Sequence, residues 1–541
     1  MNSSFNFIFI FLLGMMILAY VILVNVSCLR FERGVDIIIR NGRIIDGTGN
    51  PWYRANVAIK DDKIVQLGSL GEIKSENIIE AKGLYVVPGF IDVHTHTDEK
   101  IDSFPQVKNY LLQGVTTVVG GNCGESRFPL AEFFKDLEKK GIAINFATLI
   151  GHNTIRENVM GNDDRSPSAE ELSKMKQSVK QEMLAGAIGF STGLAYIPGR
   201  FSTTEEIIEL VKVTQPFEGI YATHLRNQGR EIKEAIEEAV EIGREAAVPV
   251  QISHIKLADE AVWGEYMLIT DPIESARKQG LEIYMDQYPY IATSSGFTSS
   301  FPGWAVAGGH EAFVERLKDQ VQYQKIKQAL IERRLSSDRG INKLQSIFIS
   351  QNKNHPEYEG KNLAEILDIL GKKNTVSEGA DLIIQMEKED EPHGIFFQMT
   401  EEDVTTLMQK PYNMIASDGG VEIPGNGFPH PRAYGTHPRV LAKYCKELNV
   451  LSIPEAIRKM SSLPAQAMGF YNRGILKPGM YADIVIFNLE EIYDSATFEK
   501  PHQYPRGIHW VLVNGKIAAH NGEVVTKNCG QILYRSGRES N

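Results

Sequence analysis

The chain has 541 residues, which excludes a single small domain and leaves two to four domains, or one large barrel with additions. Its 43% hydrophobic and 23% charged residues are ordinary globular usage, and its net charge of −11 argues against a nucleic-acid-binding surface. Four cysteines in so long a chain exclude a disulfide framework, so a cysteine that matters would act alone.

The N-terminal segment, residues 1–28, contains an unbroken apolar run over residues 7–24. Such a run lies at the lower limit for spanning a bilayer and exceeds the usual length of the apolar region of a signal peptide. Three interpretations remain open, namely a cleaved export signal, an uncleaved membrane anchor, and a lipoprotein signal with Cys28 as the lipidated residue. Each of them predicts a protein that is exported or anchored in the membrane of the cell envelope.

Both ends of the remaining chain show short strands with Asn-Gly and Asp-Gly turns. Residues 36–49 begin this pattern, and residues 482–487 and 511–516 resemble it far downstream. We therefore expect one small β-sandwich domain in which residues 34–88 combine with residues 466–530.

Between these two blocks, short apolar strands alternate with helical stretches, of which residues 168–184 and 231–246 are the clearest. This alternation predicts the α/β class and a TIM-like (β/α)8 barrel over residues 89–465. The near-continuous apolar character of the strands is typical of a parallel sheet that is buried on both faces. The eight predicted strands are residues 84–96, 116–121, 142–151, 187–193, 219–225, 248–256, 281–288 and 413–418.

Residues 298–398 interrupt the alternation between predicted strands seven and eight. This stretch has helical patterns of its own over residues 311–317 and 326–334. We expect an insertion, and two interpretations stay open: a lid over the active site, or a decoration remote from the chemistry.

Side chains with useful chemistry follow the predicted strands at their C-terminal ends, where barrel enzymes build their active sites. The first strand ends in His94-Thr95-His96, and residues two apart in an extended segment point to the same side, so both imidazoles can face one metal ion. Taken alone, each of the candidates is ordinary for a surface, core or turn position. Together they offer enough ligands for Zn²⁺, and the remaining members, at four further strand ends, are Cys123, His224, His254 and Asp418.

The first-strand motif Gly89-Phe-Ile-Asp-Val-His-Thr-His96 resembles the signature of the amidohydrolase superfamily. From about residue 36 to about residue 519, the chain more closely resembles the N-acyl-D-amino-acid deacylases (D-aminoacylases). Hydantoinase-like relatives use a carboxylated lysine after strand four, where this chain has no lysine, so a carboxylysine bridge is disfavoured. The other motifs that carry the resemblance are Gly121-Asn-Cys-Gly124, Gly189-Phe-Ser-Thr-Gly-Leu-Ala-Tyr196, Thr223-His-Leu-Arg226, Ile252-Ser-His-Ile-Lys256, Ala416-Ser-Asp-Gly419 and His430-Pro-Arg432.

The resemblance implies a tight zinc site made by Cys123, His224 and His254. It also implies a second, weaker metal position near His94 and His96, with Cys123 able to bridge the two. The implied reaction is hydrolysis of the amide bond of an N-acyl-D-amino acid to a carboxylate and a D-amino acid. Zinc suits this reaction because it lowers the pKa of a bound water.

Asp418 is the expected general base, which takes a proton from the water and returns it to the leaving amine. Arg432 is the expected partner of the substrate carboxylate, because a guanidinium matches a carboxylate fork. Lys256 follows two residues after His254 and is predicted on the same side of an extended strand, in contact with substrate. Tyr288 and Tyr196 are candidate hydroxyl donors. The alternatives are a solvated loop arginine, a surface ion pair of the lysine, and tyrosines that only pack at the barrel rim.

Two other functions remain open. One is an amidohydrolase that acts on a cyclic amide or a dipeptide, against which Cys123 and the missing strand-four lysine argue. The other is a non-catalytic binding or scaffold relative, against which the complete ligand set argues. The expected partner is a small-molecule N-acyl amino acid, with no nucleic acid and with membrane attachment only through residues 1–28.

Overall fold

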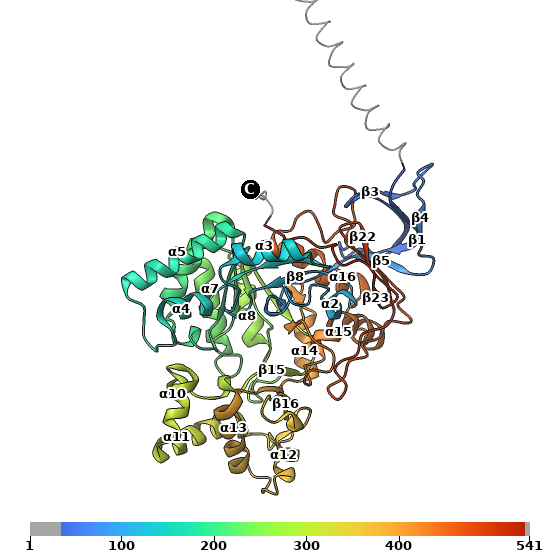
Figure 1. Cartoon of the computed structure of the whole chain (residues 1–541). Coiled ribbons are helices and arrows are strands. Elements are labelled where there is room, and N and C mark those ends of the chain that lie inside the picture. Colours follow the sequence, from blue (N-terminus) through green and yellow to red (C-terminus); the bar gives the residue numbers. More distant parts are fainter. Residues whose placement is uncertain (1–33, 536–541) are drawn as a thin grey trace, which may run out of the picture.

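The computed structural model describes residues 34–535 (Figure 1). The proposed export or anchor segment, with Cys28, therefore lies outside the described residues. Within residues 34–535, no helix is both long enough and apolar enough to cross a membrane.

One nine-stranded sheet unites the two ends of the described chain. Its join is the antiparallel pair of β5 (Tyr85–Pro88) with β20 (Ile484–Phe487), whose apolar side chains are buried. This pairing confirms that the two β-rich ends combine. The other strands of the sheet are β1 (Ile37–Ile44), β2 (Tyr53–Lys60), β3 (Lys63–Gly68), β4 (Asn77–Glu80), β21 (Ile508–Val513), β22 (Lys516–His520) and β23 (Glu523–Val524).

The turn expected at Asn41-Gly42 is wrong. These residues lie inside β1, where the register against β2 shifts and produces a β-bulge. Asn41 has a φ of 60°, a left-handed conformation that asparagine tolerates. A positive φ at an Asn-Gly pair serves a bulge as well as a hairpin turn, so the dipeptide alone did not distinguish them.

The middle of the chain consists of parallel strands and helices, consistent with the predicted (β/α)8 barrel. Each predicted strand overlaps an observed one, in the orders β6–β8–β9 and β10–β11–β12–β13–β14–β18. The pair of β19 (Gly419–Gly420) with β7 (Thr95–His96) joins the last strand region to the first. The remaining bounds are β6 (Phe90–Asp92), β8 (Val115–Gly120), β9 (Asn145–Thr148), β10 (Ile150–Gly151), β11 (Gly189–Gly193), β12 (Ile220–His224), β13 (Val250–Ile252), β14 (Ile283–Gln287) and β18 (Asn413–Ile415).

The predicted first strand is divided in the structure. Its beginning, β5, belongs to the nine-stranded sheet, and β6 starts the barrel on the other side of Gly89. A Cβ atom at Gly89 would lie 2.2 Å from the Thr116 hydroxyl oxygen, so only glycine fits where the chain changes sheets.

The two clearest predicted helices are confirmed as α5 (Ala169–Ala185) and α7 (Ile232–Ala246). Ser168 caps α5 in a capping box with Glu171, which satisfies free backbone N–H groups at the helix start. The buried residues of α7 recur at helical spacing along one face. The other helices outside the insertion include α2 (Lys108–Leu111), α3 (Leu130–Lys140), α4 (His152–Met160), α6 (Thr204–Val211), α8 (Met267–Lys278), α14 (Glu401–Met408), α15 (Arg432–Arg439), α16 (Ile453–Met460) and α17 (Ser462–Met468).

The insertion forms a separate lobe below the barrel in Figure 1. It begins with β15 (Ala292–Gly296), earlier than the predicted start at residue 298, because β15 pairs antiparallel with β17 (His393–Phe397). The lobe has an apolar core of its own, which includes Phe301, Leu363 and Ile383. Its further elements are β16 (Ile347–Gln351), α9 (Gly303–Val306), α10 (Gly309–Arg316), α11 (Gln320–Leu330), α12 (Leu363–Ile369) and α13 (Val376–Asp390).

A buried carboxyl group in this lobe makes stability depend on pH. Burial raises the pKa of Glu387, on α13, to about 7. Between pH ~4.5 and pH ~7, the native state therefore binds more protons than the unfolded state, so stability falls as the pH rises through this window. We expect Glu387→Gln to match the wild type at pH 4 and to exceed it at pH 8 by roughly 3 kcal/mol.

The midpoint of thermal unfolding, measured from pH 4 to pH 8, checks this prediction. The exposed Glu315 on α10 offers the control variant Glu315→Gln, which should keep the wild-type decline. A Glu387→Gln protein that declines as steeply as the wild type would show that this carboxyl group is not the cause.

Candidate metal centre and substrate cleft

The predicted ligands converge around the thiol of Cys123 at the carboxyl ends of the barrel strands. The Cys123 Sγ atom lies 3.3 Å from His94 Nε2, 3.8 Å from His224 Nδ1 and 3.5 Å from His254 Nε2. These residues follow or end four different strands, β6, β8, β12 and β13. The sequence-predicted ligand set is thus brought together by the fold.

Backbone conformation helps to aim three of these side chains. Cys123, His254 and Asp418 all have left-handed backbones, with φ values of 55°, 37° and 52°. Non-glycine residues pay a strain of about 1–3 kcal/mol in such conformations and are concentrated at functional sites. The chain turns sharply after each strand and directs these side chains toward the space over the barrel.

Two overlapping groups of candidate ligands result. Within each group, the ligand atoms all lie within 4.8 Å of one another, and Cys123 belongs to both. A thiol shared in this way is placed to bridge two metal positions. One group is Cys123, His224 and His254, and the other is His94, His96, Cys123 and Asp418.

The geometry of the first group suits zinc. With Zn–S near 2.3 Å and Zn–N near 2.0–2.1 Å, sulfur and nitrogen ligands at tetrahedral angles lie about 3.5 Å apart. The distances from Cys123 to His224 and His254 are close to this value. One thiol and two imidazoles also leave a fourth position open, as in catalytic zinc sites.

The protonation states of Cys123, His224 and His254 favour metal binding as well. His94 and His96 differ, because burial lowers their pKa but nearby negative charges raise it more, above its usual value. Burial raises the pKa of Cys123, but His94 and His254 lower it more, so that it lies well below its usual range. Burial lowers the pKa of His254 to about 3 and also lowers that of His224. A thiolate and neutral imidazoles are the forms that bind zinc.

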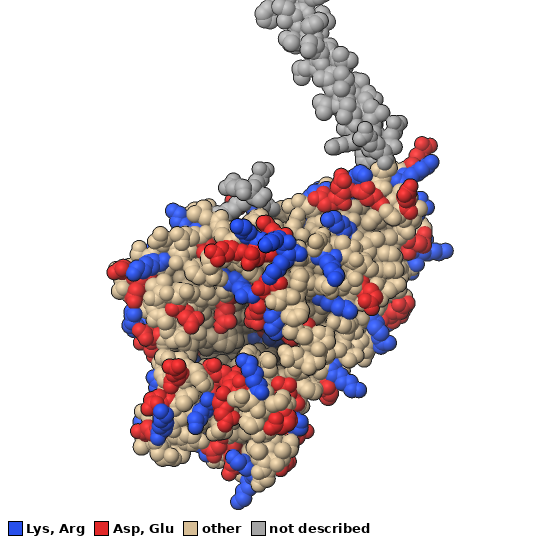
Figure 2. All heavy atoms as spheres, in the orientation of Figure 1, with Lys and Arg blue, Asp and Glu red and all other residues tan. Residues whose placement is uncertain are grey.

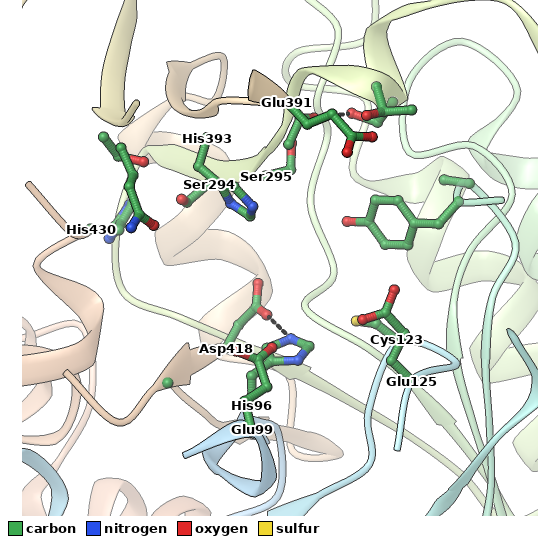
Figure 3. A pocket seen from close by; sticks show the side chains of 18 of the residues that line it. His96, Glu99, Cys123, Glu125, Ser294, Ser295, Glu391, His393, Asp418 and His430 are labelled. Atoms are coloured by element: carbon green, nitrogen blue, oxygen red, sulfur yellow. Dashed lines mark hydrogen bonds and ion pairs between the residues drawn. The ribbon is translucent and has the colours of Figure 1, made fainter. Parts of the chain in front are cut away.

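Asp418 faces the same space from the last strand region. Its Oδ1 atom lies 3.2 Å from His96 Nε2 and 3.4 Å from His94 Nε2, as Figure 3 shows for the contact with His96. Its Oδ2 atom lies 2.8 Å from Arg432 Nη1. Burial raises the pKa of Asp418, but Arg432 and the histidines lower it well below its usual range. The group is therefore an ionised carboxylate beside the ligand cluster.

Arg432 and Lys256 both lie in the site. Arg432 is buried and its guanidinium lies 4.7 Å from the centre of the Tyr288 ring, so the alternative of a solvated loop arginine is wrong. The Lys256 ammonium is buried too, 3.0 Å from His254 Nδ1, which rules out a surface ion pair. The prediction that Lys256 and His254 lie on one extended strand is wrong, however, because β13 ends at Ile252 and His254 has a left-handed backbone.

The two tyrosines also border the site. The Tyr196 ring centre lies 4.5 Å from that of His224, and Tyr288 packs beneath Arg432. His152, at the start of α4, is fully buried with its Nε2 atom 3.0 Å from a Glu206 carboxylate oxygen.

Sequence reasoning missed Asp286, near the C-terminal end of β14. One of its oxygens lies 3.3 Å from His94 Nδ1 and also accepts the backbone N–H of His254. Its other oxygen accepts a hydrogen bond from Gln251. The available signal was an acidic residue near the C-terminal end of a predicted barrel strand, where the other candidates also lie. Asp286 thus holds two candidate ligands from different strands in their orientations.

We expect Asp286→Asn to weaken zinc binding about 10–100-fold, because partners that orient metal-binding histidines typically contribute this much. Competition with a zinc chelator measures the affinity. Asp403 is a matched control, since it is buried and also accepts a backbone N–H and a side-chain donor, but far from the cluster in the chain. Equal zinc affinity in Asp286→Asn and Asp403→Asn would contradict this role.

Two cavities meet above the cluster. The first chamber has about 860 Å³ and is lined by His96, Cys123, Asp418 and Arg432, among others. The second chamber has about 680 Å³ and is lined by residues that include His224, His254, Lys256 and Tyr288. Both are bordered by Ala195, Tyr196, Ser294, Ser295, Ser299 and Asp418, so they are the two halves of one cleft.

The insertion forms one wall of this cleft. Its residues Ser294 and Ser295 lie between the chambers, and Glu391 and His393 point into the first chamber (Figure 3). Figure 2 shows the hollow between the main body and the lower lobe. The insertion is therefore part of the site and is not a remote decoration.

Comparisons with known proteins agree with this architecture. A family model described as Amidohydrolase family matches residues 77–283 and 384–519 and leaves out most of the insertion. The chain is 34% identical over 525 residues to a D-aminoacylase of Alcaligenes xylosoxydans xylosoxydans, covering 93% of this chain and 98% of that protein.

Two similar solved structures contain or concern metal. One is an N-acyl-D-glutamate deacylase from Bordetella bronchiseptica, complexed with zinc and a phosphonate mimic of the tetrahedral intermediate. It is 31% identical, with a TM-score of 0.79, over 93% of this chain and 100% of that chain. The other is a D-aminoacylase studied for its binuclear metal centre, with 32% identity and the same TM-score and coverage.

Proposed function

The chain belongs to the D-aminoacylase family of the amidohydrolase superfamily, and we propose that it uses zinc to hydrolyse the amide bond of N-acyl-D-amino acids. The observation that carries the proposal is the buried cluster of Cys123, His224 and His254, with an ionised Asp418 beside it. The activities of the relatives, a D-aminoacylase and an N-acyl-D-glutamate deacylase, support the linear D-amide as the substrate.

In this proposal, Cys123, His224 and His254 would hold zinc, which would supply a water of lowered pKa and polarise the amide carbonyl. Asp418 takes a proton from the attacking water and delivers it to the nitrogen that leaves as the C–N bond breaks. Tyr196 and residues of the insertion border the cleft in which this proton transfer takes place.

Arg432 binds the α-carboxylate of the substrate. A guanidinium has five N–H donors, so Arg432 can keep its contact with Asp418 while other donors hold the substrate. The α-carboxylate is then fixed near the base that serves the neighbouring amide nitrogen. Lys256 and Tyr288 border the same place and complete the polar surface for the substrate.

The test is a side-by-side assay of the purified protein after its zinc content is measured. We expect bound zinc and release of D-amino acids from N-acetyl-D-amino acids, with little activity on the L-enantiomers or on hydantoins. A protein that lacks zinc and cleaves none of the N-acyl-D-amino acids would overturn the proposal. Preferential opening of hydantoins would favour a cyclic-amide hydrolase instead.

Arg432→Lys tests the carboxylate partner. A lysine keeps the charge but loses the planar fork, so we expect KM to rise about 10-fold or more. Arg439 lies on the same helix, α15, and pairs with Asp494 outside the cleft, so Arg439→Lys is the control that should keep KM. An unchanged KM in Arg432→Lys would show that the α-carboxylate binds elsewhere.

We also propose that residues 1–28 export the protein or anchor it to a membrane, which is supported by the apolar run over residues 7–24. Expression of the full chain and of a variant that starts near Gly34, followed by cell fractionation, tests this. Recovery of both forms in the same soluble cellular fraction would overturn it. A loss of lipid label in Cys28→Ala would identify the lipoprotein form.

A further inference from the structure

We propose that Arg200, Arg333 and Arg334 form a second subsite of the cleft, which binds a carboxylate carried by the acyl group of the substrate. The proposal rests on the proposed function, because it concerns the acyl half of the same amide. It narrows the substrate class to N-acyl-D-amino acids whose acyl group derives from a dicarboxylic acid.

The three guanidinium groups have no acidic partner. Arg200 donates to the backbone oxygen of Phe301, and Arg334 donates to the Ser300 hydroxyl and to the Gln398 side-chain oxygen. Since Ser300 and Phe301 are neighbours, both arginines are held on the same short segment. Within residues 34–535, no carboxylate lies within ion-pair distance of Arg200, Arg333 or Arg334.

Their place in the fold brings them beside the metal centre. Arg333 and Arg334 lie on a π-helical turn (Ile331–Leu335) that continues α11, a form often found at functional sites. Both line the second chamber together with His224 and His254, and Arg200 lines the first chamber close to the border residue Tyr196. Tyr196, which borders both chambers, lies near both Arg334 and Arg432.

Most other charges in the second chamber are already paired. Arg226 pairs with Glu238, Arg230 with Asp259 and Asp338, and Lys343 with Glu260. Glu231 and Glu332 also line this chamber and keep their negative charge, because their hydrogen bonds come from neutral side-chain amides.

The arginines themselves remain charged at neutral pH. Burial, with the nearby Arg333, lowers the pKa of both Arg200 and Arg334 to about 10. Protonated guanidinium groups that form no ion pair are a suitable environment for an anion, and the nearest acidic influence is that of Glu231 on Arg333.

The first chamber has more acidic than basic lining residues, although Lys100, Arg200 and Arg432 also line it. Glu99, Glu125 and Glu422 line it, and none of them has an ion-pair partner in the described part of the chain. Figure 3 shows Glu99 and Glu125 near His96 and Cys123. A second carboxylate on the substrate is repelled there and attracted to the arginines.

The orientation of the bound substrate then places its acyl group, rather than its amino-acid part, beside the arginines. Arg432, which holds the α-carboxylate in the proposed function, lies in the first chamber. The α-carboxylate and the acyl chain leave the amide bond in opposite directions. With the amide between Asp418 and the ligand cluster, the acyl chain passes Tyr196 and extends toward Arg333 and Arg334 in the second chamber.

A matched set of substrates tests the inference. N-glutaryl-D-alanine carries a terminal carboxylate, and N-pentanoyl-D-alanine is its neutral counterpart of the same length. We expect kcat/KM to be at least about 10-fold higher for the glutaryl compound, since a hydrogen bond to a charged group contributes about 1.5–3 kcal/mol. In Arg334→Gln and in Arg333→Gln, this preference should fall toward unity, and added salt should weaken it in the wild type.

Arg316→Gln is the control variant, because Arg316 lies on α10 of the same lobe and lines neither chamber. It should keep the wild-type preference. Since Arg333 is exposed, Arg333→Gln tests the subsite even where Arg334→Gln does not fold. No glutaryl preference, or a preference unchanged in both variants, would overturn the inference.

Two further measurements complete the test. The first distinguishes a carboxylate on the acyl group from one on the amino-acid side chain, and the second separates failure of the subsite from failure of the proposed hydrolysis. If Arg334→Gln lowers kcat/KM for N-acetyl-D-glutamate but not for N-glutaryl-D-alanine, the arginines serve the amino-acid side chain and the acyl assignment is wrong. Calorimetric titration with glutarate needs no turnover. Weaker binding in Arg334→Gln than in Arg316→Gln supports the subsite even where no amide is cleaved, and equal binding overturns it.

Discussion

Asp418→Asn is expected to lower kcat by about 10²–10⁴-fold while zinc stays at Cys123, His224 and His254. Asparagine preserves the shape of the side chain but cannot accept the proton of the attacking water. Since Asp418 contacts His94 and His96 rather than His224 or His254, the first ligand group keeps its geometry. Steady-state kinetics and the zinc content of the purified variant check both parts of this result.

The substitution also leaves Arg432 without its counter-charge, so a matched control is needed. Asp494 forms a comparable, largely buried pair with Arg439, with 2.7 Å between the charged atoms. Asp494→Asn should therefore reproduce the structural effect of a broken pair without the catalytic loss. Full turnover in Asp418→Asn would reject Asp418 as the base.

Cys123→Ser is expected to lose bound zinc and to reduce kcat/KM by at least about 10³-fold, since catalysis depends on the metal for its nucleophile. Cys123 is the one residue shared by both candidate ligand groups, so its loss removes a ligand from each. A serine hydroxyl is a harder and weaker ligand for zinc than a thiolate. Metal analysis and kinetics with added zinc measure the effect.

The chain provides a control at Cys445. This cysteine is also buried, and burial raises the pKa of its thiol to about 12, so it stays protonated and outside metal chemistry. Cys445→Ala should keep zinc and turnover. Retention of wild-type zinc by Cys123→Ser would contradict the assignment of Cys123 as a central ligand.

The two groups around Cys123 give a reason to titrate zinc stepwise. The Cys123, His224 and His254 group is made only of the soft and borderline ligands that zinc prefers, whereas the His94 and His96 group includes the Asp418 carboxylate. Occupation of the second position would engage the proposed base. Activity measured against zinc equivalents distinguishes a second ion that assists turnover from one that hinders it.

The sequence by itself predicted the elements whose signals are local. Apolar strands that end in polar residues, and charged helices between them, could be read in order along the chain, and so could the two β-rich ends. The five ligands and Asp418 were found because each follows or ends a strand, and parallel strands place such residues at one rim. For this reason, Cys123, His224 and His254 could be proposed as ligands from their positions along the chain.

Only the tertiary structure decided how these residues share their contacts. Asp286 lies inside a buried strand, and its role appeared only when His94 and His254 were placed against it. The pair of Asp418 with Arg432 and the grouping of Arg200 with Arg334 likewise join residues distant in the chain. Periodicity reports which face a side chain occupies, but not which distant group it meets there.

The positions of charged side chains and of cysteines add to what composition alone shows. The net charge of −11 argues against one class of partner, but it does not show which acidic and basic side chains line the cleft. The cysteine count excluded a disulfide framework, and position after a strand selected Cys123. The sequence determined which residues were available for chemistry, and long-range packing decided their partners. The reason is that contacts between residues far apart in the chain depend on distances in the folded structure, which local sequence patterns do not contain.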